Sequence, residues 1–257
     1  MLRGDLGESF ALRRPVRTVI ADALPISIGL GAASLLLTFL IGVPVGMIQA
    51  RHRGSAVDRL LTVASIAAYS SPSFWLALAL VGVFTYGAAM WGFPSWIRLP
   101  AFGVETPGAM LAGGARLSDI IRHSILPVGI LALIGAAGIA RYARTSFADM
   151  MREDFVRTAR AKGASEPRID YRHVLATILP TLIVLFALAL PGVVAGSVFV
   201  ESVFSWPGMG KTMLTAINAR DYPLVMGATV VYAAVVVLAN LAADVAMPLV
   251  DPRRRVG

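Results

Sequence analysis

Charged residues divide this sequence into long stretches that carry no charge at all. A helix needs about 20 apolar residues, within a range of about 17–25, to cross the hydrocarbon core of a bilayer, so an uncharged stretch of this length predicts a membrane span. The uncharged stretches run over residues 23–50, 60–97, 124–140, 174–200 and 222–243. Each of them can cross a bilayer once.

The composition also indicates a membrane protein. The 257 residues are 57% hydrophobic and 15% charged, with a mean hydropathy of +0.73. Soluble domains are about 45–50% apolar and about 25% charged, so this excess of apolar residues needs a solvent other than water. The sequence therefore predicts an all-α polytopic membrane protein with five transmembrane helices.

Prolines interrupt two of the predicted spans. Pro72 lies inside the second span, Leu60–Tyr86, where it kinks the helix and forms either a packed kink or a surface that lines a substrate path. Pro191 and Gly192 predict a break near the centre of the fourth span, which is stable only where protein or a water-filled cavity surrounds it. The Gly- and Pro-rich segment from Trp91 to Asp119 is expected to be irregular, with at most one short interfacial helix.

Arg and Lys set the expected orientation. The segments after the first, third and fifth spans carry fourteen of the 23 basic residues, and short loops rich in Arg and Lys stay in the cytoplasm. The domains are then an extracytoplasmic tail over residues 1–21, a transmembrane domain over 22–250 and a cytoplasmic C-terminal tail over 251–257. This topology and the anionic lipid headgroups explain the net charge of +8, so nucleic acid is not expected as a partner.

Residues 205–212 read SWPGMGKT and end like a phosphate-binding loop. That loop, G-x-x-x-x-G-K-[ST], requires Gly where this chain has Ser205, and it lies between a strand and a helix. Here the stretch follows a membrane span and is expected on the external side, where there is no ATP. The sequence therefore excludes a nucleotide site at this position.

The largest segment predicted on the cytoplasmic side is strongly basic. Asp154–Lys162 predicts a short helix, with an acid at its start, basic residues towards its end and Gly163 placed to terminate it. Ser165 is placed to cap a second short helix whose first turn holds Glu166 and Pro167. Basic residues alone would fit a solvated loop held by headgroups, whereas two defined helices indicate a helix–turn–helix unit that projects from the membrane.

Several motifs occur in a fixed order along essentially the whole chain. They are GDLGESF at 4–10, SPSFW at 71–75, DFVRTARAKG at 154–163, RH at 172–173, LP at 179–180, ESVFSWPGMG at 201–210, RDYP at 220–223 and DPRRR at 251–255. In this order they resemble the permease subunits of ABC importers, specifically the dipeptide, oligopeptide and nickel branch. Only the motif at 154–163 and the FSWPG stretch would be specific alone, but together the motifs are highly specific.

The resemblance implies a type I ABC importer permease fold and a non-enzymatic subunit of an ATP-driven, binding-protein-dependent importer. The implied substrates are dipeptides or oligopeptides, with nickel or another small solute as the alternative. The implied partners are a second homologous permease subunit, two cytoplasmic ATPase subunits, an extracytoplasmic solute-binding protein and membrane lipid. No cofactor, metal site or catalytic residue is implied, because ATP hydrolysis belongs to the partner subunits.

The same resemblance assigns site residues. The helical unit within residues 146–172 becomes a coupling element that docks into a groove on an ATPase subunit. Small residues there would allow close approach, and Arg157 could meet acidic groups on the partner. The residues carried over are Asp154, Arg157, Thr158, Ala159, Gly163, Arg172 and His173.

A second, weaker assignment concerns the segment from Phe204 to Arg220. The resemblance implies that it lies near the gate and the docked binding protein, so that SWPGMGKT is a turn leading into a short helix with Lys211 and Arg220 as outward charges. The candidate contact residues are Phe204, Trp206, Pro207 and Gly208.

Three departures from the family pattern stand out. The general signature begins Glu-Ala-Ala where this chain has Arg157-Thr158-Ala159, as is usual in the peptide branch, and Thr177 replaces a usual Asn. Family members also begin with a membrane helix before the Gly-Asp-Leu-Gly motif, whereas this sequence starts almost at the motif. We expect a start site assigned too far downstream.

Two other classes of protein fit the sequence poorly. An intramembrane enzyme would need a catalytic motif, but the three His residues lie on different segments and neither Gly-x-Ser-x-Gly nor His-Glu-x-x-His occurs. An ion-coupled transporter working alone would need charged groups in the middle of the membrane, and the five uncharged stretches provide none.

Overall fold

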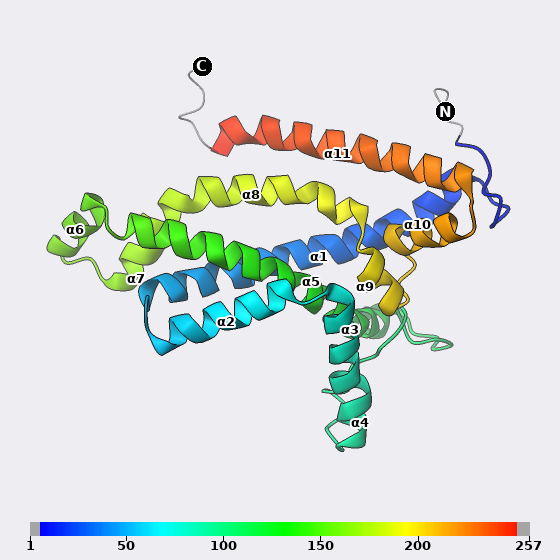
Figure 1. Cartoon of the computed structure of the whole chain (residues 1–257), viewed down its shortest axis with the longest axis horizontal. Coiled ribbons are helices and arrows are strands. Elements are labelled where there is room, and N and C mark those ends of the chain that lie inside the picture. Colours follow the sequence, from blue (N-terminus) through cyan, green and yellow to red (C-terminus); the bar gives the residue numbers. More distant parts are fainter. Residues whose placement is uncertain (1–5, 251–257) are drawn as a thin grey trace. The chain divides into compact units, whose positions relative to one another are not determined.

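The computed structural model describes residues 6–250, except for the side chains of residues 195, 243, 244 and 246–250. The tail predicted at 251–257 and the first residues of the N-terminal tail lie outside the described residues. Figure 1 shows the helices in chain order. Their bounds are α1 Val16–Arg51, α2 Ala56–Ser70, α3 Ser73–Val81, the π-helical segment η1 Gly82–Gly87, α4 Ala88–Met90, α5 Gly113–Met150, α6 Asp154–Ala161, α7 Glu166–Arg168, the π-helical segment η2 Ile169–Leu175, α8 Ala176–Ala195, α9 Val198–Val203, α10 Met209–Asn218 and α11 Tyr222–Val250.

Five helical stretches of the described chain are long and apolar enough to cross a membrane. They are Val16–Arg51, Ser73–Met90, Gly113–Met150, Glu166–Val194 and Tyr222–Ala242. The predicted fold class, all-α with five candidate spans, is therefore confirmed. The first and third helices start earlier than their uncharged stretches do, so α1 takes up part of the predicted N-terminal tail.

The bounds of the second predicted span are wrong. The chain does not form one kinked helix over Leu60–Tyr86, because α2 ends at Ser70 and a new helix, α3, begins at Ser73. Pro72 has extended backbone angles, with φ −58° and ψ 132°. A proline disfavours the helical conformation in the residue before it and removes an amide donor, so the Ser71-Pro72 pair separates two helices here.

The break predicted at Pro191 and Gly192 is also wrong. Helix α8 continues through both residues to position 195. The chain leaves the helix at Gly196, whose φ of +69° is a left-handed conformation that side chains disfavour. Pro191 lies within the last turns of the helix, so its missing amide removes one hydrogen bond and the rest of the helix persists.

The chain forms two compact units, each built from separate stretches of sequence. Unit one comprises Met1–Ser34, Ser71–Leu131 and Leu190–Leu238, and unit two comprises Leu35–Ser70, Ala132–Ala189 and Ala239–Gly257. In unit one the start of α1 packs against α10 and α11. The buried residues of that core are Val16, Val19, Ile20, Ala23, Met209, Ala216, Leu224 and Ala228.

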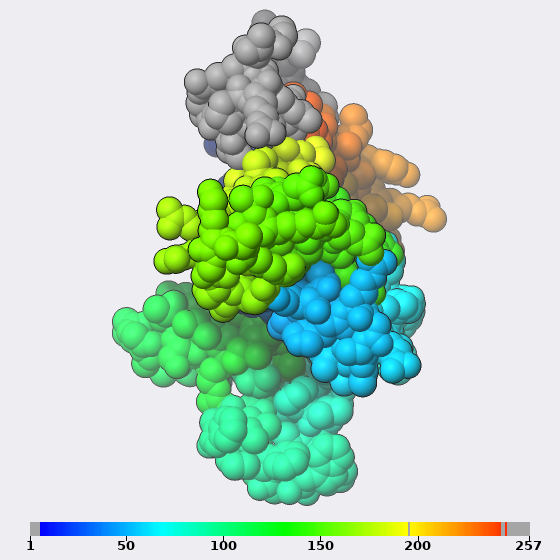
Figure 2. All heavy atoms as spheres, turned by 90° about the vertical axis from the view of Figure 1, so that its left-hand side faces the viewer, coloured from blue at the N-terminus to red at the C-terminus, as the bar shows by residue number. Residues whose placement is uncertain are grey.

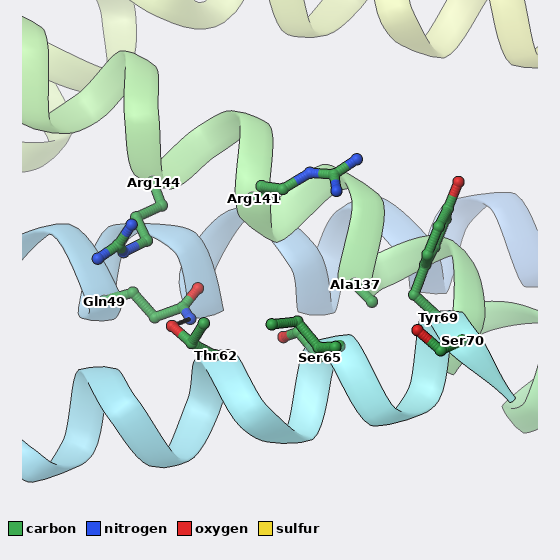
Figure 3. A pocket seen from close by; sticks show the side chains of 9 residues that line it. Gln49, Thr62, Ser65, Tyr69, Ser70, Ala137, Arg141 and Arg144 are labelled. Atoms are coloured by element: carbon green, nitrogen blue, oxygen red, sulfur yellow. Dashed lines mark hydrogen bonds between the residues drawn. The ribbon is translucent and has the colours of Figure 1, made fainter.

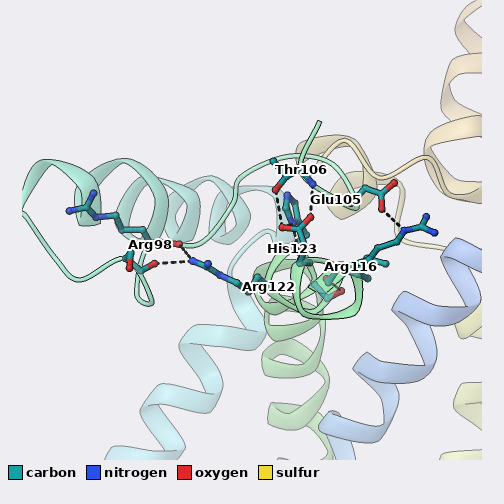
Figure 4. Close-up of polar contacts among 10 residues, drawn as sticks. Arg98, Glu105, Thr106, Arg116, Arg122 and His123 are labelled. Carbon is teal, nitrogen blue, oxygen red and sulfur yellow. Dashed lines mark hydrogen bonds and ion pairs between the residues drawn. The ribbon is translucent and has the colours of Figure 1, made fainter. Parts of the chain in front are cut away.

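The segment predicted to be irregular is irregular from residue 91 to 112 and contains no helix there. Polar contacts fix it to the start of α5 (Figure 4). Asp119 accepts hydrogen bonds from the backbone amide of Thr106 at 2.6 Å and from its hydroxyl at 2.8 Å. Arg116 pairs with Glu105 at 2.8 Å. The loop is thus held by side-chain contacts and isolated backbone hydrogen bonds, and not by regular structure.

In unit two, α1 and α5 approach closely at glycines. A Cβ atom added at Gly46 would lie 2.5 Å from the carbonyl oxygen of Ala140 and 2.7 Å from the Cβ of Ala143. No side chain fits at that separation. By contrast, a Cβ at Gly138 would have no atom within 4 Å. Small residues that let backbones approach are a common feature of helix packing in membranes.

Candidate functional site

The short helix predicted at Asp154–Lys162 is present. Helix α6 covers Asp154–Ala161, and its carboxyl end is closed at Lys162. Gly163 has a φ of +78°, the left-handed conformation expected of a terminating glycine. The start, end and terminator of this helix were therefore predicted correctly.

Helix α6 has one buried face and one exposed face. Val156 and Ala159 are 0% and 8% exposed, and they pack in the core of unit two with Phe147 of α5 and Ile169. The small side chain of Ala159 is thus used for packing within the chain, and it is not open for close approach by another protein. The core residues of this unit are Met47, Phe147, Val156, Ala159, Ile169, Val174, Ile178 and Leu182.

The polar residues of α6 occupy the exposed face. Arg157 contacts Asp154 at 3.3 Å, but the two side chains are 75% and 93% exposed. Thr158 is exposed as well, and its hydroxyl donates to the carbonyl oxygen of Asp154 at 3.0 Å. An ion pair this exposed is worth little, so the Arg157 guanidinium remains available to other partners.

The second predicted helix is the beginning of a membrane-spanning one. Ser165 stands at the N-cap of α7, as predicted, but its side chain makes no capping hydrogen bond. From Glu166 the chain continues through η2 into α8 as one helical stretch. Arg172 is exposed and His173 is partly exposed on η2. Residues Asp154 to His173 therefore form a helix, a turn and the first turns of a long helix.

An arginine far away in the sequence holds this turn in place. The Arg51 guanidinium, at the end of α1, contacts Glu166 and Asp170, both at 2.7 Å. Arg160 of α6 also pairs with Glu166, at 2.8 Å, and this hydrogen bond raises the pKa of the Arg160 guanidinium. Figure 2 shows α6 uncovered, with the turn between α1 and α2 beside it. This network could not be predicted from the sequence, because nothing in the order of residues links Arg51 to position 166.

A buried carboxylate organises the turn around residues 205–212. Glu201 is fully buried. It accepts hydrogen bonds from the hydroxyl of Ser27 at 2.8 Å, from the amide of Ser197 at 3.2 Å and from the amide of Lys211 at 3.0 Å. We call Glu201 with Ser27, Ser197 and Lys211 the Glu201 cluster. The backbone amide of Lys211, which would face a phosphate in a nucleotide-binding loop, binds the chain's own carboxylate.

The SWPGMGKT stretch is a turn followed by the short helix α10, as predicted. Three of the four candidate contact residues at this turn, counting Phe204 just before it, are buried. Phe204 and Trp206 are 1% and 5% exposed, and a Cβ at Gly208 would lie 2.5 Å from the hydroxyl oxygen of Ser27. Only Pro207 is exposed. The buried three shape the turn from inside.

Two of the motifs quoted above meet in unit one. Asp221, from RDYP, is fully buried and accepts hydrogen bonds from Ser9, which belongs to GDLGESF. The amides of Phe10 and Ala11 also donate to it, at 3.2 Å and 3.1 Å. Burial alone would raise the pKa of the Asp221 carboxyl, but these hydrogen bonds outweigh burial and hold the pKa below its ordinary value. The N-terminal segment is thereby fixed to the start of α11.

Sequence comparison defines the class of protein. Residues 42–256 match the model of the family described as "binding-protein-dependent transport system inner membrane component". The chain is 37% identical over 254 residues to the oligopeptide transport system permease protein AppB of Bacillus subtilis, covering 98% of this chain and 77% of AppB. It is 35% identical over 262 residues to the di/tripeptide transport system permease protein DppB of Pseudomonas aeruginosa, covering 99% of this chain and 78% of DppB.

Solved structures share the fold. A chain of the methionine ABC transporter MetNI, in an inward-facing conformation, superimposes with a TM-score of 0.66 at 17% identity, covering 91% of this chain and 97% of that chain. The protein therefore belongs to the binding-protein-dependent transport system inner membrane component family. It is a multi-pass permease subunit of an ABC importer in the inner membrane, it is not itself an ATPase, and this class of complex implies ATPase and binding-protein partners.

Proposed function

We propose that this permease imports dipeptides or oligopeptides and that the coupling segment, residues 146–172, transmits motion from an ATPase subunit. In this proposal the chain works with a second homologous permease subunit, two cytoplasmic ATPase subunits and an extracytoplasmic binding protein. The coupling segment and the C-terminus face the cytoplasm. Peptides are favoured over nickel because the relatives AppB and DppB are named as oligopeptide and di/tripeptide permeases.

The two faces of α6 carry the proposal for coupling. One face is anchored in the core through Val156 and Ala159, while Arg157 and Thr158 on the other face are exposed. A rigid-body movement of a partner can be passed on only by an element that is stiff and has a surface of its own. The contacts of Arg51 and Arg160 with Glu166 hold the turn after α6. The packing of Val156 and Ala159 in the core supplies the stiffness that a solvated loop lacks.

Exposed aromatic residues support a protein partner at this segment. Tyr171 is 65% exposed and Phe155 is 38% exposed. Protein interfaces are enriched in Tyr, Phe and Arg, and these residues often carry much of the binding energy. Together with Arg157, the two aromatic side chains give the coupling segment the composition of a docking surface.

Charge reversal at Arg157 tests the coupling role. In liposomes that contain the complete transporter, we expect Arg157→Glu to lower uptake of labelled trialanine at least about tenfold, because an acidic residue would repel acidic groups on the ATPase. The apparent melting temperature should stay unchanged, because Arg157 is exposed. The matched control is Arg59→Glu, an exposed arginine of α2. Equal uptake by wild type and Arg157→Glu would refute the coupling role.

We also propose that Pro207 contacts the binding protein. It is the exposed residue of a turn that buried Phe204, Trp206 and Gly208 shape. A photoreactive crosslinker on Pro207→Cys should then capture the binding protein during transport. Capture of equal yield from Ser73→Cys, a partly exposed position on α3, would contradict a specific contact.

A further inference from the structure

An open cavity of about 280 Å³ lies in unit two, between α2 and α5 and against α1 (Figure 3). Its walls include side chains from all three helices. Six of them matter here: Gln49 from α1, Thr62, Ser65 and Tyr69 from α2, and Arg141 and Arg144 from α5. A mainly apolar wall that carries a few well-placed polar groups is typical of a small-molecule site.

The two arginines of the cavity differ in how their charges are balanced. Arg144 is neutralised by Asp58, because its Nε and Nη2 atoms both lie 2.8 Å from the carboxylate oxygens. Arg141 makes no ion pair with any residue in the described part of the chain. Its guanidinium lies 5.5 Å from the centre of the Tyr69 ring. The cavity therefore has one positive charge without a carboxylate partner.

Arg141 stands at the end of the third predicted span. It directly follows the uncharged stretch 124–140, nine residues before the end of α5 at Met150. Its side chain is exposed on the cavity, where an anionic ligand can reach it. The face of the Tyr69 ring adds a cation–π contact that orients the guanidinium.

The cavity also contains an unused hydrogen-bond acceptor. Gln49 is 2% exposed, and its amide nitrogen donates to the hydroxyl of Thr62 at 3.1 Å. Its carbonyl oxygen, Oε1, is buried and has no hydrogen-bond partner in the described part of the chain. A buried acceptor without a donor destabilises the protein, so this oxygen is suited to a ligand N–H group.

We propose that this cavity binds the carboxyl end of the transported peptide. The Arg141 guanidinium pairs with the terminal carboxylate, and Gln49 Oε1 accepts a hydrogen bond from a peptide N–H. One end of a peptide supplies both groups, and a planar guanidinium matches a carboxylate. Small-molecule sites have volumes of about 300–1,000 Å³, so this cavity suits the last residues of a peptide and not a whole oligopeptide. The inference rests on the proposed function.

The charge of the cavity is tested first, without any transport. The chain contains no Cys, so Ser65→Cys places a single thiol in the cavity wall. We expect an anionic methanethiosulfonate reagent to modify this thiol about tenfold faster than a cationic one, because one unpaired positive charge attracts anions at this range. Adding Arg141→Gln should abolish the preference, while adding Arg53→Gln, an exposed arginine outside the cavity wall, should leave it. A preference that survives Arg141→Gln would overturn the proposal.

The ligand is tested next, in the complete transporter with its partners and ATP. Trialanine should slow modification of the Ser65→Cys thiol at least about threefold. Trialanine amide, which lacks the terminal carboxylate, should not slow it. Arg141→Gln should remove the protection by trialanine. Equal protection by both peptides, or none by either, would overturn the proposal. The proposal would also be overturned if the thiol were protected without peptide in phosphatidylglycerol vesicles but not in phosphatidylcholine vesicles. The bound anion would then be a lipid headgroup.

The two proposals can fail separately. Normal uptake of trialanine without protection of the thiol would overturn the cavity assignment alone. If the wild-type transporter did not take up trialanine, the proposed peptide function would be overturned. The assignment of a peptide ligand to the cavity depends on that function and would also be overturned.

Discussion

Two carboxylates of unit one, Glu201 and Asp221, are held differently from two carboxylates of the coupling segment, Asp154 and Glu166. Glu201 and Asp221 are fully buried and are surrounded by backbone amides and serine hydroxyls. Asp154 is 93% exposed and Glu166 is 46% exposed, and both face arginines. The buried carboxylates are satisfied by backbone amides and short serine side chains, whereas the exposed carboxylates are paired with long, flexible arginine side chains.

This difference separates a structural role from a recognition role. Buried carboxylates that accept several fixed hydrogen bonds rigidify the loops they join, because releasing any donor leaves it unsatisfied. Exposed arginine–carboxylate pairs contribute little stability and can exchange partners. We therefore expect substitutions in the Glu201 cluster to act on folding, and substitutions on the open face of α6 to act on transport.

The largest effect on stability is expected at Glu201. Glu201→Ala removes the acceptor for the buried Ser27 hydroxyl and for two partly buried amides. Each donor left unpaired costs about 1–3 kcal/mol, so the free energy of unfolding should fall by about 3 kcal/mol or more. Denaturant unfolding of the solubilised protein measures this. Glu8→Ala is the control, because Glu8 is exposed in the same unit. If the Glu201→Ala protein were as stable as the Glu8→Ala control, the structural role of Glu201 would be refuted.

Asp58 is an intermediate case, since it is buried but paired with an arginine. Its contacts with Arg144 and the amide of Gly54 lower the pKa of the Asp58 carboxyl from 3.8 to about 2. Asp58→Asn should reduce the free energy of unfolding by about 2–3 kcal/mol near neutral pH, as expected for a hydrogen bond between charged groups.

The pH dependence of this effect has a defined sign. Because the folded-state pKa of Asp58 is the lower one, its stabilisation is complete above pH 3.8 and is lost as the pH falls towards 2. The stability difference between wild type and Asp58→Asn should therefore be constant from about pH 5 to 8 and smaller at about pH 3. A difference that grows on acidification would contradict the assigned pair.

A smaller effect is expected at Ser9. Ser9→Ala removes one of the donors to Asp221 and an acceptor for the amide of Leu12. The loss should be about 1–2 kcal/mol, because the amides of Phe10 and Ala11 still hold the carboxylate. Thermal unfolding compared with Ser73→Ala, where the serine is only partly buried, measures it. Equal melting temperatures of Ser9→Ala and Ser73→Ala would mean that the contact between the GDLGESF and RDYP motifs does not stabilise the protein.

The smallest effect on stability is expected at Arg160. Its pair with Glu166 is 44% and 46% exposed, so Arg160→Gln should change the free energy of unfolding by less than about 1 kcal/mol. Denaturant unfolding measures this change. The control is Arg168→Gln, because Arg168 is another exposed arginine of this segment. A loss as large as that of Glu201→Ala would mean that the coupling segment is held as rigidly as the Glu201 cluster.

The sequence predicted what depends on local pattern. Five apolar stretches gave five candidate spans, and the acid, the basic residues and Gly163 placed α6 correctly, because helix ends are set by nearby residues. Proline was read wrongly twice. Pro72 separates two helices where a kink was expected, and Pro191 stays inside a helix where a break was expected, since packing decides how a proline is accommodated.

Contacts between distant residues were out of reach of the sequence. Glu201 and Asp221 stood inside quoted motifs, but their burial and their partners Ser27 and Ser9 follow only from the fold. The ion pairs of Arg51 likewise join residues more than 100 positions apart. A hydrophobic span that ends directly in an acidic residue, as at Val200 and Glu201, was the one available signal.

The side of the membrane on which α6 lies decides whether an ATPase subunit can reach the coupling segment. Because the chain lacks Cys, Thr158→Cys, expressed without the ATPase subunits that would cover it, provides a single exposed thiol on α6 for an impermeant maleimide. The proposed orientation predicts labelling in inside-out vesicles and none in intact spheroplasts. Labelling in intact spheroplasts would place the segment outside the cell, beyond reach of any ATPase, and would contradict the account.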